Sequence, residues 1–290
     1  MNEVIMLMEQ VPSFYYGLVI VLGLLVGSFL NVVIYRLPIM MQRSWEAECA
    51  ECFPKADIET DDSRFNLVLP RSRCPTCNHL IGSLENIPVI SWLLQKGRCK
   101  HCQCKISPRY PSIEILTSVM SLAVAYFIPF GWPAIFALVF TWVLISLTFI
   151  DFDTMLLPDQ LTLPLLWLGL LVNMSGTFTG LEDAVLGAVL GYLSLWSIYW
   201  AFKLATGKEG MGYGDFKLLA ALGAWFGWQA LPLIIILSSF AGAIIGITLL
   251  IASKDKQSRP IPFGPYLAIA GWVYLVYGVE LTMLYYSFIL

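Results

Sequence analysis

Residues 115–150 read ILTSVMSLAVAYFIPFGWPAIFALVFTWVLISLTFI and contain no charged side chain over 36 positions. This stretch is too long for one membrane-spanning helix and fits two spans of about 18 residues each. Pro129, Gly131 and Pro133 mark the turn between the two spans. Two apolar helices joined by so short a turn predict a chain that crosses a membrane more than once.

The composition of the whole chain agrees with this prediction. Of its 290 residues, 58% are hydrophobic and 13% are charged, whereas about 25% are charged in soluble globular domains. The mean hydropathy is +0.74. These values exclude an ordinary soluble domain, a disordered chain and a secreted disulfide scaffold. The net charge of −3 argues against a general nucleic-acid-binding protein.

Further uncharged stretches extend the pattern to about eight helices in an all-α polytopic membrane protein. We expect these helices at residues 12–35, 112–129, 133–151, 160–176, 184–203, 215–228, 231–252 and 264–288. A soluble insertion separates the first helix from the other seven. We therefore expect three parts, namely a first transmembrane helix in residues 1–35, a loop domain in 36–111 and a seven-helix membrane domain in 112–290.

The 17 Lys and Arg residues predict how these helices are oriented. Eleven lie in residues 36–109, three in 203–217 and three in 254–259. Eight spans with the N-terminus outside place all three groups on one side, which the positive-inside rule makes cytoplasmic. Both termini are then outside. Because Glu3 and Glu9 precede the first apolar run and no basic segment does, we expect no cleavable signal peptide.

All seven cysteines lie in the predicted loop domain, which faces the reducing cytoplasm. The pairs Cys74–Cys77 and Cys99–Cys102 have the C-x2-C spacing of zinc knuckles, and two such knuckles complete a tetrahedral site. Four thiolates leave no open position for water, so we expect a structural zinc ion. A loop with few apolar runs cannot form much of a hydrophobic core, so it needs a cross-link such as a bound metal ion in order to fold.

Other interpretations of the cysteines remain open. A C-x2-C pair is also typical of a redox dithiol, and a cysteine can serve merely as a small apolar residue. A third pair, Cys49 and Cys52, lies in an acidic context, and Cys104 could compete with Cys102 as a zinc ligand.

Carboxylates at the membrane surface are costly, so each is a candidate for function. Asp151 is expected at the cytoplasmic C-terminal end of the third predicted helix. A negative charge there opposes the helix dipole by about 0.3–1 kcal/mol, so capping does not explain it. Asp159 is expected to be the N-cap of the fourth predicted helix, and Asp153 could simply be solvated.

Asp215 follows Gly210, Gly212 and Gly214, which lie at alternate positions. Asp215 could be an N-cap, but a plain cap does not need three glycines, which permit positive φ and the close approach of another segment. No strand precedes the glycines, which excludes a dinucleotide-binding fingerprint.

The predicted topology places Asp151 and Asp215 at the same depth, on different helices. Two carboxylates that meet in a partly dry site share a proton, so that one acts as a base on water while the other polarises a carbonyl. This is the arrangement of aspartic proteases.

Several motifs resemble those of the bacterial type IV prepilin peptidases, which are membrane aspartic proteases of the GxGD type. They are GYGDFK at 212–217, FIDFDTMLLPDQLTL at 149–163, GSFLNVVIYRLP at 27–38, SRCPTC at 72–77 and RYPSIE at 109–114. Together they span most of the chain, from about residue 17 to residue 265.

The resemblance implies a bifunctional enzyme of the bacterial inner membrane, with its active site at the cytoplasmic face. The family cleaves the basic leader of type IV prepilins and type II secretion pseudopilins, and then methylates the new N-terminal amine with S-adenosylmethionine. The resemblance places the protease pair on Asp151 and Asp215. Methyl transfer is linked to the loop domain around Gly97, although the sequence has no Rossmann-like fingerprint for S-adenosylmethionine. The expected partners are these protein substrates and the lipid bilayer, with no nucleic acid.

Acidic residues of the loop domain could attract the lysines of a basic leader, or they could only solvate the loop. These residues are Glu46, Glu48, Glu51, Asp57, Glu59, Asp61 and Asp62.

Three other classes of function explain the sequence less well. A transporter or channel would need carboxylates at mid-membrane, and the predicted helix interiors contain none. A membrane thiol oxidoreductase would need its C-x2-C pairs on the oxidising side of the membrane or inside the bilayer. A zinc-dependent scaffold would leave Asp151 and Asp215 without a purpose.

Overall fold

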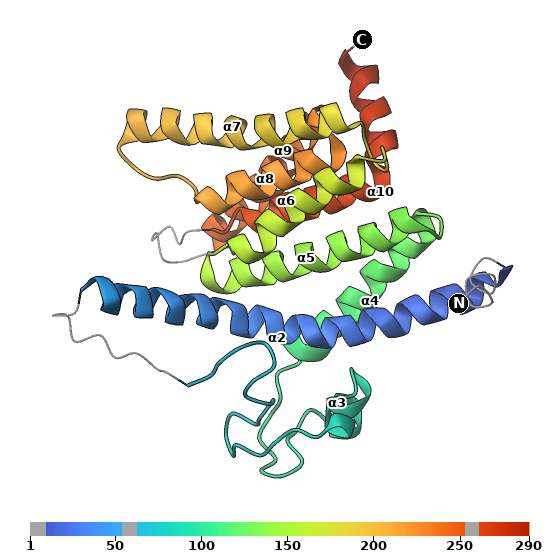
Figure 1. Ribbon diagram of the computed structural model, residues 1–290, viewed down its shortest axis with the longest axis vertical. Helices are drawn as coiled ribbons and strands as arrows, with labels where there is room; N and C mark the ends of the chain where they lie inside the picture. The colour runs from blue at the N-terminus through green and yellow to red at the C-terminus, as the bar shows by residue number, and fades with distance from the viewer. Residues whose placement is uncertain (1–9, 54–62, 253–260, 290) are drawn as a thin grey trace. The chain divides into compact units, whose positions relative to one another are not determined.

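The computed structural model describes residues 10–53, 63–252 and 261–289, which form helices and loops without a strand (Figure 1). The chain divides into two compact units, Met1–Phe130 and Gly131–Leu290, which we call unit 1 and unit 2. Unit 1 contains α2 (Pro12–Cys52), the 3-10 helix η1 (Ser83–Asn86), α3 (Ile90–Leu94) and α4 (Arg109–Phe127). Unit 2 contains α5 (Trp132–Thr154), α6 (Asp159–Asn173), α7 (Leu181–Thr206), α8 (Tyr213–Phe226), η2 (Trp228–Ala230), α9 (Leu231–Ala252) and α10 (Gly264–Ile289).

The predicted all-α polytopic class is confirmed. Among the described residues, 6 helices are long and apolar enough to cross a membrane. The helices α6 and α8 coincide with the fourth and sixth predicted spans but contain 15 and 14 residues. At 1.5 Å per residue they are about 22 and 21 Å long, whereas the hydrocarbon core of a bilayer is about 30 Å thick. The helix count therefore agrees approximately with the prediction, with two of the eight shorter than a full span.

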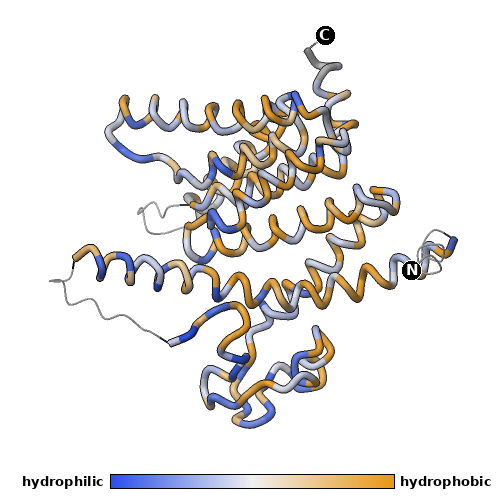
Figure 2. The backbone as a smooth tube through the Cα atoms, in the orientation of Figure 1, coloured by the Kyte–Doolittle hydropathy of each residue, from blue (hydrophilic) through white to orange (hydrophobic). Residues whose placement is uncertain are grey.

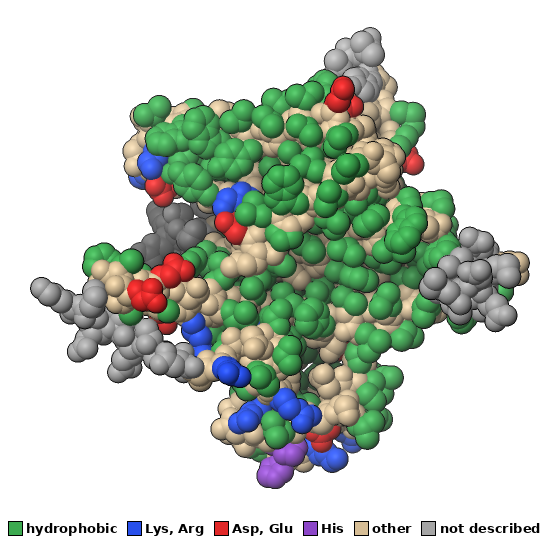
Figure 3. Space-filling model, in the orientation of Figure 1, with side chains coloured by type: hydrophobic (Ala, Val, Ile, Leu, Met, Phe, Trp, Pro, Cys, Tyr) green, Lys and Arg blue, Asp and Glu red, His purple; other side chains and the backbone are tan. Residues whose placement is uncertain are grey.

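The surface of the helices is apolar, as expected for helices that contact lipid. Figure 3 shows hydrophobic side chains over most of the helical surface in this view. Bulky side chains such as Trp132, Leu204 and Phe240 are more than two-thirds exposed. Patches of this extent are rare on soluble monomers, whereas lipid tails solvate them without cost.

The first helix is longer than predicted. We expected it to end at residue 35, but α2 continues to Cys52 and contains 41 residues, about 62 Å. After residue 35 the side chains of α2 become more hydrophilic, and the helix continues as a polar extension (Figure 2). Pro38 does not end it. Beyond this proline, Gln42 donates a hydrogen bond to Glu46 at 2.9 Å, a contact at i, i+4 that supports a solvated helix.

In unit 1, α2 packs closely against α4 through two glycines. A Cβ on Gly23 would lie 2.7 Å from the Cα of Ser118, and one on Gly27 would lie 2.7 Å from the Cα of Glu114. The hydroxyl of Ser118 donates a hydrogen bond to the carbonyl of Ile20 at 3.0 Å. Small residues at a membrane helix interface permit this close approach and gain van der Waals contact that lipid does not supply.

In unit 2, the short helix α8 forms the centre of the core, with α6, α7 and α10 packed around it. Gly187 of α7 and Gly223 of α8 are in backbone contact. The Trp225 side chain is fully buried, and its indole N–H donates to the carbonyl of Leu165 at 2.8 Å. The Asn173 amide donates to the carbonyls of two residues at the end of α8, which therefore have partners although they are buried. These contacts fix α8, and with it the residues at its N-terminus.

Candidate active site and metal centre

Asp151 lies in the last turn of α5 and is buried, with 5% of its surface exposed. Its carboxylate Oδ2 accepts a hydrogen bond from the backbone N–H of Gly264 at 3.1 Å. Gly264 is the first residue of α10, whose first turn has backbone N–H groups without helical partners. The N-terminal end of α10 therefore holds the carboxylate of Asp151 in place.

Asp215 is the third residue of α8 and is also buried, with 6% exposed. Its Oδ2 accepts the backbone N–H of Gly212, the N-cap residue, at 3.3 Å. The helix begins at Tyr213, two residues before the predicted start, so Asp215 lies inside the first turn and is not the N-cap. A carboxylate at this position interacts favourably with the helix dipole.

Leu157, which follows α5, contacts the start of α8 beside Asp215 and the start of α10 at Gly264. A Cβ on Gly214 would lie 2.6 Å from the Cβ of Leu157, and a Cβ on Gly264 would lie 3.0 Å from its two methyl groups. The negative charge of Asp151 acts on the carboxyl of Asp215. The C-terminal end of α5 and the N-terminal ends of α8 and α10 therefore meet at one site that contains both carboxyl groups.

The glycine run before Asp215 behaves partly as predicted. The expected close approach of another segment occurs at Gly214, which contacts Leu157, and at Gly210, where a Cβ would lie 3.0 Å from the ring of Phe202. The expectation of positive φ is wrong for this run. Positive φ occurs instead at Gly207, the C-cap of α7, with φ of 70°.

The prediction that Asp159 is the N-cap of a helix is wrong. The N-cap of α6 is Pro158, and Asp159 is the first helical residue and makes no capping hydrogen bond. Its carboxylate instead accepts two hydrogen bonds from Lys217 of α8, at 2.6 and 2.8 Å. Lys217 comes two residues after Asp215, so the ion pair ties the start of α6 to the first turn of α8. Asp153 is exposed.

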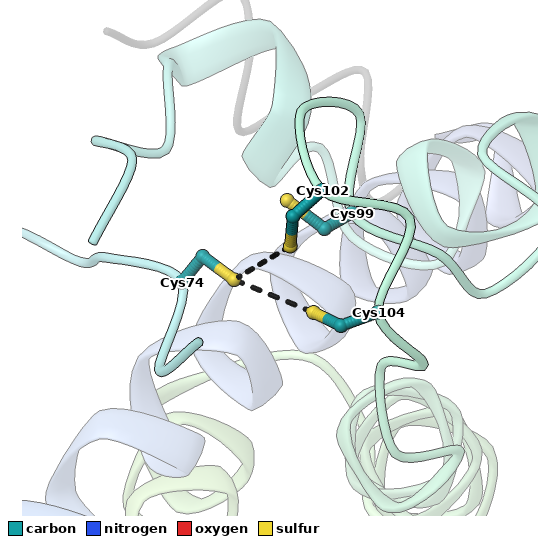
Figure 4. Close-up of side chains that lie close together, drawn as sticks. All are labelled: Cys74, Cys99, Cys102 and Cys104. Atoms are coloured by element: carbon teal, nitrogen blue, oxygen red, sulfur yellow. Dashed lines mark hydrogen bonds between the residues drawn. The ribbon is translucent and has the colours of Figure 1, made fainter. Parts of the chain in front are cut away.

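The cysteine cluster lies in unit 1. The thiols of Cys74, Cys99, Cys102 and Cys104 lie within 4.8 Å of one another, with Cys74 facing the other three from a separate segment (Figure 4). The Sγ atom of Cys74 is 3.7 Å from that of Cys102 and 3.4 Å from that of Cys104. Cys77, which we predicted as a ligand, has its Sγ atom 4.0 Å from that of Cys99.

These separations fit a zinc ion. Sulfur atoms at the corners of a tetrahedron with Zn–S bonds of about 2.3 Å are about 3.8 Å apart. The three separations between 3.4 and 4.0 Å agree with this value. The four thiols of the cluster are therefore close enough to supply four ligands, whereas the predicted ligand Cys77 lies outside this group and approaches it at Cys99.

Residues 73–80 and 98–105 form two equivalent knuckles. The backbone N–H of Cys74 donates to the carbonyl of His79, and that of Cys99 donates to Cys104, both at 2.9 Å. An isolated antiparallel bridge closes each knuckle. Each knuckle contributes its own C-x2-C pair, and Cys104 takes the position that His79 has in the first knuckle. This equivalence pairs Cys77 with Cys102 and leaves Cys104 as an additional thiol.

The backbone of each knuckle favours a thiolate at its first cysteine. The N–H groups of Cys77 and Thr76 lower the pKa of Cys74 to about 6, below its ordinary value. The N–H groups of Cys102 and His101 similarly lower the pKa of Cys99. The thiolate is the form of cysteine that binds zinc. By favouring the thiolate, the folded backbone of each knuckle favours metal binding.

Cys49 and Cys52 lie apart from this cluster. Both are exposed on the polar extension of α2, near its C-terminal end. The acidic residues Glu46, Glu48 and Glu51 are on the same extension. The other acidic residues named above, in 57–62, lie outside the described residues.

Gly97 has a structural explanation. Its φ is +66°, and a Cβ at this position would lie 2.8 Å from the indole ring of Trp92. The indole N–H of Trp92 donates to the carbonyl of Ile106 at 3.2 Å, just beyond the second knuckle. Glycine therefore suits this position, because it accepts the positive φ and leaves room for the indole ring of Trp92.

Sequence reasoning missed Gly264 and Lys217 as residues of the site. Lys217 carries no local signal for its contact with Asp159, which is 58 residues away. Gly264 precedes a proline at the junction of a polar segment and an apolar helix, a pattern typical of a helix start whose backbone N–H groups can hold an anion.

Two family models match the chain. The model described as Bacterial Peptidase A24 N-terminal domain matches residues 21–128. The model described as Type IV leader peptidase family matches residues 138–247, a range that includes Asp151 and Asp215.

Known proteins similar to the chain include several prepilin leader peptidase/N-methyltransferases. The protein of Aeromonas salmonicida strain A449 is 59% identical over 291 residues and is matched over 100% of both chains. The protein of Aeromonas hydrophila is 60% identical over 279 residues, 96% of each chain. The protein of Pseudomonas aeruginosa is 55% identical over 269 residues, 93% of this chain and 92% of its own. No solved structure matches the chain.

Proposed function

The chain belongs to the type IV leader peptidase family, and from this membership we propose that it is a bifunctional prepilin peptidase and N-methyltransferase. It cleaves the leader peptide of type IV prepilins and type II secretion pseudopilins, and it then methylates the new N-terminal residue. The observation that carries this proposal is the meeting of two buried carboxyl groups, Asp151 and Asp215, within the matched range. Relatives that are 55–60% identical to the chain are named as both prepilin leader peptidases and N-methyltransferases.

We assign the proteolytic chemistry to Asp151 and Asp215. The two carboxyls share a proton because two buried negative charges at one site repel each other. The ionised carboxylate takes a proton from the attacking water, while the protonated carboxyl donates a hydrogen bond to the carbonyl of the scissile amide. The N–H groups of Gly264 and Gly212 keep one oxygen of each carboxyl in place, leaving the other for the reaction.

We assign a structural zinc ion to Cys74, Cys77, Cys99 and Cys102. The equivalence of the two knuckles supports this set, since each then supplies both cysteines of its C-x2-C pair. Cys104 is the alternative fourth ligand, because its thiol is 3.4 Å from that of Cys74. Four thiolates saturate the ion, so zinc holds the loop together and does not activate water.

Methyl transfer is assigned to the loop domain, with S-adenosylmethionine as the source of the methyl group. Gly97 contributes by allowing Trp92 to pack beside the second zinc knuckle. A larger residue at Gly97 would displace Trp92 and would therefore affect methyl transfer through the shape of the loop. The proposed parts of the chain remain residues 1–35, 36–111 and 112–290.

We propose that the enzyme lies in the bacterial inner membrane with both termini in the periplasm. All of the basic residues are then cytoplasmic. The order of the helices in unit 2 supports this topology, because the end of α5 and the starts of α8 and α10 meet at one site, as alternating spans require. The scissile bond of a substrate with a cytoplasmic leader lies at this level of the membrane.

Reporter fusions test this orientation. Fusions at Gly131, Gly176 and Leu290 are expected to report a periplasmic location, and fusions at Thr60 and Gln257 a cytoplasmic one. Leu290, Thr60 and Gln257 lie outside the described residues. A cytoplasmic signal at Leu290 would show that the chain crosses the membrane an odd number of times, which the eight-span topology does not allow.

The ion pair between Asp159 and Lys217 is expected to contribute little to stability. The Asp159→Asn variant should lose about 0–1 kcal/mol of unfolding free energy, because the side chains are 51% and 27% exposed. Cleavage should remain measurable. Thermal unfolding of Asp159→Asn, Lys217→Gln and the double variant measures the effect, and the two changes should not add because they remove the same contact. A loss of cleavage as complete as that of Asp215→Asn would instead place Asp159 in the catalytic machinery.

A two-product assay tests the proposed function directly. Purified enzyme in detergent or lipid is incubated with a purified prepilin and S-adenosylmethionine, and mass spectrometry reports both the loss of the leader and the added methyl group. We expect a cleaved and methylated product. If the substrate stays intact under conditions in which a known relative cleaves it, the proposed function is wrong.

A further inference from the structure

Large apolar side chains are exposed in the loop domain at the 3-10 helix η1 and at α3, which pack against each other. Leu84 is 80% exposed and Leu94 is 79% exposed, and Ile87, Ile90 and Leu93 are exposed as well. Apolar side chains that are exposed singly need no explanation, but five within residues 84–94 indicate a surface that contacts another apolar phase. We call these five residues the η1–α3 patch.

The patch occupies one face of this segment, and another face is anchored inside unit 1. Ile90, Leu93 and Leu94 share a face of α3, because residues at i, i+3 and i+4 of a helix do so. Trp92 lies on a different face, where its indole N–H donates to the carbonyl of Ile106 at 3.2 Å. The anchored tryptophan therefore keeps the patch turned outward.

A hydrogen bond to α4 places this segment at the depth of the membrane. The backbone N–H of Val89, directly before α3, donates to the buried carboxylate of Glu114 at 2.7 Å. Glu114 lies about 3 Å inside the second predicted span, which starts at residue 112, and packs against Gly27, which lies about 12 Å inside the end of the first predicted span. Accordingly, α3 is level with the middle of α2 (Figure 1). Interfacial segments insert their apolar faces to about 5–10 Å, which matches this depth.

The charge of the loop domain suits an anionic bilayer. Residues 63–109 contain eight Lys and Arg but only one acidic residue, Glu85. Lys96 and Arg98, which follow α3, are exposed. Basic segments next to membrane-spanning helices are attracted to anionic lipid headgroups, and the loop domain continues into such a helix at each end. Apolar side chains beside exposed basic ones are typical of a segment that lies in the membrane interface.

We propose that the η1–α3 patch inserts into the cytoplasmic leaflet of the bilayer, with the basic residues of the loop domain against the headgroups of anionic lipids. The apolar side chains then contact acyl chains, while Lys96 and Arg98 stay at the level of the phosphates. The loop domain is membrane-associated and not freely soluble. This docking goes beyond both proposed activities and does not depend on them, and only the name of the leaflet rests on the proposed orientation.

Labelling with a photoreactive lipid tests the proposal. The full-length enzyme is reconstituted in bilayers containing phosphatidylglycerol with a photoreactive group in its acyl chain, and after illumination mass spectrometry locates the adducts. Residues 83–94 are expected to be labelled, with the exposed side of α9 as the positive control. Residues 66–70 should stay unlabelled although Val68 is 77% exposed, because Arg36, just outside the first predicted span, holds the carbonyls of Asn66 and Pro70.

The lipid headgroup is varied in the same experiment. When phosphatidylcholine with the same photoreactive chain replaces phosphatidylglycerol throughout, labelling of residues 83–94 should fall at least about fivefold, the effect of one basic residue at an anionic surface. Equal labelling with both lipids would overturn the role proposed for the basic residues.

Substitutions in the patch provide the second readout. Leu93→Glu combined with Leu94→Glu should abolish the labelling of residues 83–94, because carboxylates lose their hydration among acyl chains. Leu84→Glu should act in the same direction from η1 and serves if the double variant does not fold. Val68→Glu is the matched control, an exposed apolar residue outside the patch, and should leave the labelling unchanged.

Two results would overturn the insertion itself. If residues 83–94 of the wild type stay unlabelled while α9 is labelled, a protein surface and not lipid covers the patch. If residues 66–70 are labelled as strongly as 83–94, the lipid reacts with any exposed part of the loop domain and the patch has no special depth.

Discussion

The Asp215→Asn variant is expected to lose leader cleavage by at least about 10⁴-fold, and Asp151→Asn is expected to lose nearly as much. Asn has almost the same shape as Asp, so the fold should survive. Asn cannot take a proton from water, and it cannot supply the acidic proton that polarises the scissile carbonyl. The two carboxyls act as a unit, so the double variant should be little worse than either single variant.

Methyl transfer to a pilin that has already been cleaved should persist in both variants. The pair lies in unit 2, whereas we assign methyl transfer to the loop domain of unit 1. Incubation with a pre-cleaved pilin and S-adenosylmethionine measures this activity by the added methyl mass. Loss of both activities in either variant would point to unfolding, and thermal unfolding of the same preparation tests for that.

Loss of zinc is expected to have the second large effect. Cys74→Ser combined with Cys99→Ser removes the first cysteine of each knuckle and should leave the chain without metal. Structural zinc contributes about 10–16 kcal/mol to the folding of small zinc peptides, so the loop should unfold and become sensitive to proteases. Elemental analysis measures the metal. Fewer than about 0.5 zinc per chain in a wild-type protein prepared without chelators would exclude the site.

Single variants distinguish the two sets of ligands. Cys77→Ser is expected to lose zinc and Cys104→Ser to retain it, because the equivalence of the knuckles makes Cys77 a ligand and Cys104 an additional thiol. The reverse result would assign the fourth ligand to Cys104. In the wild type, zinc content should fall as pH is lowered, since protons compete with the metal for thiolates, and a rise in zinc at acid pH would contradict thiolate ligation.

The sequence was sufficient to predict most of the helices and to place Asp151 and Asp215 on the same side of the membrane, whereas the resemblance to a family identified them as a pair. Hydropathy locates spans, and alternating spans determine which helix ends share a side of the membrane. The sequence was not sufficient to predict where α2 ends. Hydropathy indicates only which part of a helix contacts lipid, whereas the backbone hydrogen bonds that define the helix continue into water. The polar extension to Cys52 therefore appears only in the structure.

Contacts between residues distant in sequence account for the other differences. The pattern around Asp159 is typical of an N-cap, yet Lys217 binds its carboxylate from another helix. Gly264 holds Asp151 across 113 residues, which no local spacing reveals. The two cysteine knuckles were predictable because each is a local structure, whereas the proximity of Cys104 to Cys74 depends on how the two knuckles face each other.

The boundaries of the three predicted parts were placed where the chain passes between the membrane and solvent. The boundary between the two compact units depends instead on which helices pack against each other. Unit 1 includes α4 together with the loop because Gly23 and Gly27 of α2 allow α4 to pack against that helix. Hydropathy alone gives α4 the same character as the helices of unit 2. The glycines of α2 were the signal in the sequence that could have paired it with α4.

The measurement that tests the assignment of the catalytic pair most directly compares Asp151→Asn with Asp153→Asn in one leader-cleavage assay. The two residues are neighbours at the end of α5, but Asp151 is buried against Gly264 and Asp153 is exposed. We expect no detectable cleavage by Asp151→Asn and cleavage close to that of the wild type by Asp153→Asn. Efficient cleavage by Asp151→Asn together with an inactive Asp153→Asn would show that the wrong carboxylate has been assigned.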